Sequence, residues 1–175
     1  QGILHLRTER FQSALELQAQ ALQIGRDLSL PRIIGAASYY AALTLLVRGK
    51  SEDIGDAALA AQLGLRETLG TSDEPNARVV CAMVCLARQE FERGLDQIAM
   101  ARQLKRDGDM YDLEAELLVS EIDLLMGASR TVEADKKLIE AVEILRLRAE
   151  AVTDTPEELA LFYASSVAHR RLSAS

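Results

Sequence analysis

The two cysteines of the chain, Cys81 and Cys85, lie four residues apart in the segment VVCAMVCLA. In a helix this spacing places both thiols on one face. A structural zinc site needs four ligands, often with histidine among them. The two histidines, His5 and His169, lie far from the cysteines at opposite ends of the chain. We therefore expect the cysteines to be small buried apolar residues in a reducing cytosol.

Catalytic arrangements are not indicated. A Ser-His-Asp or Cys-His site would have to be built by a long-range contact to an isolated histidine, and we expect both histidines to lie on the surface. The segment GKSEDIG contains Gly49, Lys50 and Ser51 in the order of a phosphate-binding loop. However, Thr44 stands five positions before Gly49, where that loop requires glycine, and no strand precedes it. We expect a turn between helices there and no enzymatic activity.

The densest acidic set comprises Glu114, Glu116, Glu121 and Asp123. A di-metal helical site would require Glu-x-x-His motifs, and the sequence has none. We expect a solvated or groove-facing acidic stripe, with no metal and no cofactor.

Composition excludes two classes of partner. The net charge of −7 argues against a nucleic-acid surface, which would need clustered lysine and arginine. The longest uncharged run, 33–47, has 15 residues. This is shorter than the roughly 18–20 residues that span a bilayer, so we expect a buried helix and no membrane contact. With no signal peptide or lipidation motif visible, we expect a cytoplasmic location. Because the chain begins at Gln1, we expect a piece of a longer protein.

Turn signals divide the chain into helices. Pro31, Pro75 and Pro156 each stand where a helix begins, and Thr155 with Glu158 forms a capping box. Gly49, Gly70, Gly108 and Gly127 fall at expected helix ends. The predicted helices, besides a truncated one before residue 8, cover 9–27, 31–48, 52–68, 75–88, 91–106, 110–127, 131–150 and 156–172.

An internal repeat connects these helices. Its template is an aromatic or branched residue followed three, seven and ten positions later by a small, an apolar and a second small residue; Gln18, Ala61 and Thr131 depart from it. The four sets are Phe11, Ala14, Gln18, Ala21; Ile54, Ala57, Ala61, Gly64; Phe91, Gly94, Ile98, Ala101; and Thr131, Ala134, Leu138, Ala141. Their starts are 43, 37 and 40 residues apart, and the second and fourth positions are always Ala or Gly. A period of this length predicts stacked helical hairpins, in which the small residues let neighbouring backbones approach closely. The alternative is an unrelated helical bundle.

The third set resembles the tetratricopeptide (TPR) repeat, with its early aromatic and its small residues in the second helix of each hairpin. The small residue nine positions before the template start is Gly2 or Ala82 in two repeats, but Leu45 or Ile122 in the others. The repeats also exceed the usual length of about 34 residues. The chain is most similar to the long, divergent repeats in sensor regions of maltose-regulator-like and other ATPase-coupled bacterial regulators. The resemblance implies an all-α, right-handed α-solenoid over residues 1–175, with a C-terminal capping helix at 156–172.

In such a fold the first helices of the hairpins line a concave groove. The repeat offset makes three sets of positions equivalent: Tyr39, Asn76, Glu116; Ala42, Val79, Val119; and Leu46, Met83, Asp123. The candidate groove residues are Tyr39, Asn76, Met83, Glu116 and Asp123. The alternative is that Leu46, Val79 and Met83 belong to the core.

The sequence therefore favours a non-catalytic interaction module of a larger bacterial regulatory or signalling protein, such as a transcription regulator. Its partner would be a protein, a peptide or a neighbouring domain of the same chain. Two alternatives remain: a small-molecule sensor with an enclosed apolar pocket between the first helices, or a homo-oligomeric scaffold.

Overall fold

The computed structural model describes residues 10–104, 113–152, 155–165 and 167–174. These residues are almost entirely helical, and no strand occurs among them. The α-helices are α2 (Phe11–Asp27), α3 (Pro31–Arg48), α4 (Ile54–Thr68), α5 (Glu74–Ala87), α6 (Phe91–Leu104), α7 (Glu114–Gly127), α8 (Thr131–Val152), α9 (Pro156–Ala164) and α10 (Val167–Ser173), with a 3-10 turn, η1 (Ser51–Asp53), before α4. The predicted helix before residue 8 and the position of Gly108 lie outside the described residues.

The template and the prolines mark where helices begin. The four template starts, Phe11, Ile54, Phe91 and Thr131, are the first residues of α2, α4, α6 and α8. Pro31 and Pro156 are the first residues of α3 and α9, and Pro75 is the second residue of α5. Thr155 and Glu158 exchange both hydrogen bonds of the expected capping box. These local signals act where backbone N–H groups lack intrahelical partners, so they fix helix starts independently of tertiary context.

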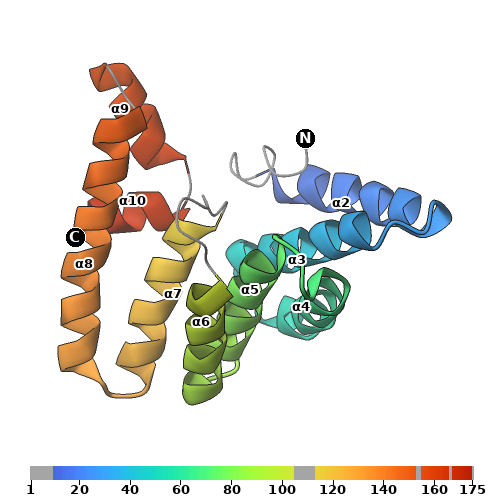
Figure 1. Cartoon of the computed structure of the whole chain (residues 1–175), viewed down its shortest axis with the longest axis horizontal. Helices are drawn as coiled ribbons and strands as arrows, with labels where there is room; N and C mark the ends of the chain where they lie inside the picture. Colours follow the sequence, from blue (N-terminus) through green and yellow to red (C-terminus); the bar gives the residue numbers. More distant parts are fainter. Residues whose placement is uncertain (1–9, 105–112, 153–154, 166, 175) are drawn as a thin grey trace.

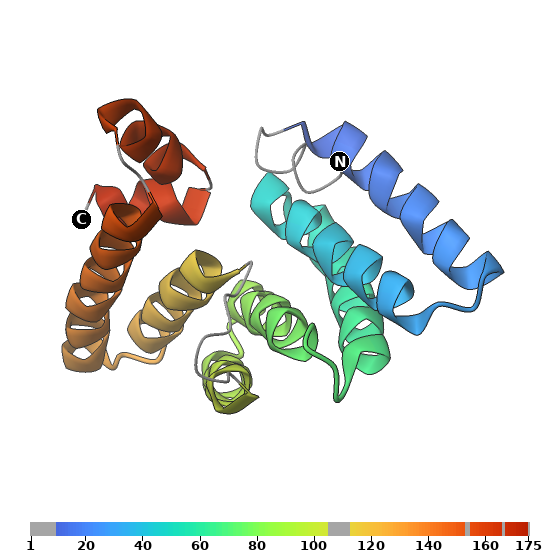
Figure 2. The ribbon, with the colours of Figure 1, turned by 45° about the horizontal axis from the view of Figure 1, so that its top comes forward.

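The helices pack in the order of the chain. Each of α2 to α8 contacts the next helix, and α3 also contacts α5, as α5 contacts α7. Figures 1 and 2 show the hairpins following one another along an arc, from α2 and α3 at one end to α7 and α8 near the other. The odd-numbered helices α3, α5 and α7 therefore form a continuous row of contacts.

Most of the small residues of the template are buried between neighbouring helices, and Ala21 is half-buried. Ala14, Ala57, Gly94 and Ala134 at the second position are all buried. A Cβ on Gly94 of α6 would meet the side chain of Leu124 in α7 and the Cβ of Cys85 in α5. Packing at these positions thus depends on the absence of side-chain volume.

Three short connections share one conformation. Ser29, Gln89 and Ser129 each have φ between 52° and 62°, in the left-handed region. In each case the next residue donates its backbone N–H to a carbonyl five residues earlier, as Arg130 does to Leu125 at 2.8 Å. This is the Schellman arrangement, which satisfies the last carbonyls of a helix, here without the usual glycine.

The prediction of one helix over 156–172 is wrong, because the chain bends at Ser165 and forms α9 and α10. The described side chains of α9 are exposed or half-buried, whereas Ala168 and Leu172 of α10 are buried. Helix α10 contacts α7 and α8. Burial of the apolar area of Ala168 and Leu172 therefore favours the bent arrangement.

The uncharged segment 33–47 lies within α3, where eight residues are buried. Within the described ranges, no helix combines the length and the apolar character that crossing a membrane requires.

Candidate functional site

Two of the five candidate groove residues are inside the molecule. Tyr39 is 2% exposed and Asn76 is 6% exposed. The backbone N of Tyr39 lies 2.8 Å from the point where a Cβ of Gly64 would stand, so Tyr39 is held at the contact of α3 with α4. Contrary to expectation, these two side chains do not line an exposed groove, because both are buried where their helices pack against neighbouring helices.

The other three candidates are half-buried: Met83 in α5, and Glu116 and Asp123 in α7. Leu46 of α3 and Val119 of α7 are also half-buried. Leu46 and Met83 are equivalent positions of consecutive hairpins. Each of α3, α5 and α7 therefore carries one of these half-buried apolar side chains, while Val79 is core.

The acidic set of α7 does not form a solvated stripe. Glu114 binds Arg148 of α8 at 2.5 Å, and Glu121 binds Arg102 of α6. Lys137 of α8 approaches Glu121 at 4.0 Å. These carboxylates are half-buried and face oppositely charged groups of neighbouring helices, so they tie α7 to α6 and α8.

Asp123, the last of the acidic candidates, pairs with the C-terminal helix. Arg171 of α10 donates from both terminal nitrogens to the two Asp123 carboxylate oxygens. This pairing raises the pKa of Arg171. The position predicted to bind a partner is therefore occupied by the chain itself. In the described part of the chain, no group of three or more His, Cys, Asp or Glu side chains could hold a metal.

Of the two histidines expected at the surface, His169 keeps only part of its surface exposed, and His5 lies outside the described residues. His169 is half-buried, with its ring 4.9 Å from the ring of Phe162 in an edge-on arrangement. Its Nδ1 lies 3.2 Å from the Ser165 hydroxyl. The ring contact joins α9 to α10 across the bend, whereas Ser165 and His169 are four residues apart and would also be neighbours in one straight helix.

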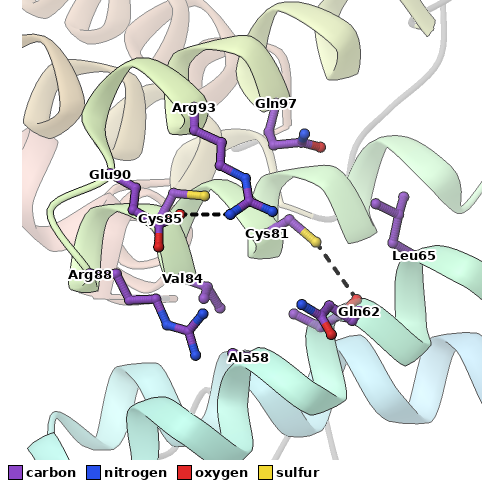
Figure 3. Close-up of a pocket in the computed structure, with 11 residues that line it drawn as sticks. Ala58, Gln62, Leu65, Cys81, Val84, Cys85, Arg88, Glu90, Arg93 and Gln97 are labelled. Carbon is purple, nitrogen blue, oxygen red and sulfur yellow. Dashed lines mark hydrogen bonds and ion pairs between the residues drawn. The ribbon is translucent and has the colours of Figure 1, made fainter.

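A pocket of about 100 Å³ lies between α4, α5 and α6 (Figure 3). Its apolar part consists of Ala58, Ala61, Leu65 and Val84, and its polar part of Gln62, Gln97, Arg88, Glu90 and Arg93. Cys81 and Cys85 complete it. The pocket exists because α4 and α6 both pack on α5, which lies between them in the chain.

Both cysteines are free thiols, and Cys85 is buried whereas Cys81 is partly exposed. The Cys81 thiol points to the Ala61 carbonyl, with Sγ and O 3.7 Å apart. Burial, with a smaller contribution from Cys85, raises the Cys81 pKa to about 11. Burial also raises the pKa of Cys85, and Arg93 partly opposes this. Both groups are therefore protonated thiols at neutral pH and poor nucleophiles.

The two arginines at the rim of the pocket differ in their hydrogen bonding. Arg93 donates to Glu90 at 2.8 Å. Arg88 is exposed, and its guanidinium has no hydrogen bond or ion pair within the part of the chain that the structure describes. The spacing of the cysteines predicted their shared face, but Gln62, Leu65 and Ala58 come from α4, and no local sequence signal indicates that they meet the thiols.

The segment 49–51 is a helix-to-helix turn, as expected: Gly49 ends α3 in a left-handed conformation and Ser51 begins η1.

Neither a protein-family model, nor a curated protein, nor a solved structure matches the chain.

Proposed function

We propose that the chain is a non-catalytic protein-interaction module of the tetratricopeptide-like type, stacked as a right-handed α-solenoid within a larger bacterial regulatory or signalling protein. The observation that carries the proposal is the coincidence of the four template starts with the first residues of α2, α4, α6 and α8. The buried small residues at equivalent positions support the same assignment.

The contacts between helices add a second line of support. In stacked hairpins the first helix of each unit touches the first helix of the next, as α3 touches α5 and α5 touches α7. Helix α10 contacts α7 and α8, which is the position that the first helix of a following hairpin would occupy. We assign α10 the role of a cap on the last complete hairpin.

The partner surface that we propose is the row of half-buried side chains on these first helices: Leu46, Met83, Val119 and Glu116. An apolar row with a carboxylate at its edge suits an amphipathic helix or an extended peptide. Methionine adapts its shape to different partner side chains, which favours such a role for Met83.

The size of the pocket between α4 and α6 favours this proposal over a sensor for drug-sized molecules. Its volume of about 100 Å³ is smaller than the roughly 300 Å³ that such ligands occupy. It also lies between α4, α5 and α6, and so is not enclosed by the first helices of successive hairpins.

The test compares two single variants of the chain as baits in cell extract, with captured proteins quantified by mass spectrometry. Met83→Gln places an amide in the proposed row, and the matched control Leu59→Gln changes α4, where Leu59 is 68% exposed. We expect at least one specific partner to fall by about tenfold with Met83→Gln, equivalent to about 1.4 kcal/mol, and to be retained by Leu59→Gln. Identical capture by both variants would reject this surface, and no specific capture by the unmodified chain would reject the interaction function.

A further inference from the structure

The pocket between α4, α5 and α6 contains two sulfur atoms on one helix face. Cys81 and Cys85 both line it, and neither is in a disulfide. Residues four apart in a helix have Cβ atoms about 5–6 Å apart, so rotation about χ1 can bring the two sulfurs toward a shared atom. Figure 3 shows both side chains leaving α5 on the side of the pocket, with Cys81 turned toward α4.

The other groups around the thiols restrict what this pair can bind. Calcium and magnesium require several oxygen ligands, and the nearest carboxylate, Glu90, already accepts a hydrogen bond from Arg93. A tetrahedral zinc site would need further ligands, and the described residues contain no group of three or more metal-ligating side chains. Two sulfurs among Ala58, Ala61 and Val84 match a thiophilic centre that needs only two bonds from the protein.

We propose that this pocket is a dithiol-chelating site for a monosubstituted trivalent arsenical, bound through the Sγ atoms of Cys81 and Cys85. The reaction is a condensation of R–As=O with two thiols. Two As–S bonds form, while the two S–H bonds and the arsenic–oxygen bond break. The oxygen leaves with both protons as water. Arsenic stays trivalent, so neither an oxidant nor a reductant takes part.

The electrostatics of the pocket fit this chemistry. Burial keeps both thiols protonated, with the Cys81 pKa raised to about 11. A divalent metal would bind only after both thiols released their protons to solvent, which their raised pKa values oppose, whereas in the condensation the thiol protons leave with the oxygen as water. The same high pKa predicts slow association, because the thiolate is the attacking species.

The pocket volume sets the size of the ligand. A dry apolar cavity of about 150 Å³ is known to accommodate benzene, and this pocket of about 100 Å³ is smaller. It can therefore enclose the arsenic and a small substituent, and a larger substituent would have to extend past the exposed Arg88 at the rim. The inference is independent of the proposed interaction function, because it uses the side of α5 that faces α4 and α6.

The test uses the full reduced chain and phenylarsine oxide as the probe. One equivalent should give an adduct of one arsenical per chain by intact mass and remove both titratable thiols, with the far-UV circular dichroism unchanged. An added dithiol such as 2,3-dimercaptopropanol should reverse the reaction. Cys81→Ser and Cys85→Ser should each weaken binding at least about 100-fold, because the second As–S bond is intramolecular only in the native pair.

A matched control keeps two thiols but separates them. The double variant C85S/A99C moves one thiol to an exposed position of α6 and should bind as weakly as the single-cysteine variants. Equal affinity of this variant and the unmodified chain would overturn the proposal. It would equally be overturned by two arsenicals per chain, or by binding that requires denaturant or removes helical circular dichroism.

Discussion

Gly64 and Gly55 of α4 provide a controlled test of how closely the first complete hairpin packs. A Cβ at position 64 would lie 2.8 Å from the backbone N of Tyr39 and 2.9 Å from its Cβ. Neither atom can move by side-chain rotation, so α3 and α4 would have to separate. At Gly55, no atom lies within 4 Å of the equivalent point.

The two Gly→Ala variants therefore differ by the cost of overpacking. In a helix interior, alanine is favoured over glycine by up to about 1 kcal/mol. Overpacking typically costs about 1–3 kcal/mol. Gly64 lies inside α4 whereas Gly55 is its second residue, so the gain in helix propensity is larger at position 64 and offsets part of the overpacking cost. Gly64→Ala should therefore be less stable than Gly55→Ala by about 1–2 kcal/mol. In a chain of this size, each kcal/mol corresponds to about 2–4 °C in Tm.

Urea unfolding followed by far-UV circular dichroism measures both free energies of unfolding. Gly55→Ala should match or exceed the unmodified chain, and Gly64→Ala should fall below it with an unchanged dependence on urea. Equal stability of the two variants would refute the close contact between α3 and α4.

Three further changes test separate features. Ser129→Gly should raise the free energy of unfolding by about 0.5–1 kcal/mol in the same urea assay, because Ser129 has φ of 62° and glycine adopts this conformation without strain. Arg48 lowers the pKa of Asp53 from 3.8 by a charge-assisted hydrogen bond. Protonation of Asp53 thus removes this stabilisation as the pH falls below 3.8. The unmodified chain should therefore exceed Asp53→Asn in free energy of unfolding by less below pH 3.8 than at neutral pH, as measured by acid titration. Alkylation of Cys81 by iodoacetamide, followed by peptide mass spectrometry, should be slow at neutral pH and accelerate up to about pH 11, whereas a rate independent of pH would contradict its raised pKa.

The beginnings of the helices could be predicted from the sequence because they depend on local chemistry. Proline at Pro31 and Pro156 and the capping box at Thr155 act within one helical turn. Small residues at matching offsets of the template, such as Ala57 and Ala134, were also informative, because small residues at such spacing favour buried positions between helices, and both are buried.

The features that could not be predicted depend on residues far apart in the chain. Arg171 and Asp123 are separated by 48 positions, and their pairing requires the bend at Ser165. The burial of Tyr39 depends on Gly64, a residue of the next helix. The pocket beside Cys81 also needs α4 and α6 in place. Repeat position therefore identified which helix each candidate occupies, but not how much of its side chain a partner could reach.

The claim that the template residues are contact points between hairpins is tested most directly on α6 and α8. Ala101 and Ala134 are 0% and 1% exposed, whereas Ala99 is an exposed residue of the same helix as Ala101. Ala101→Leu and Ala134→Leu should each lower the free energy of unfolding by about 1–3 kcal/mol through overpacking, and Ala99→Leu should leave it within about 0.5 kcal/mol. If Ala101→Leu and Ala134→Leu were as stable as Ala99→Leu, the repeat register and the stacked hairpins built on it would be contradicted.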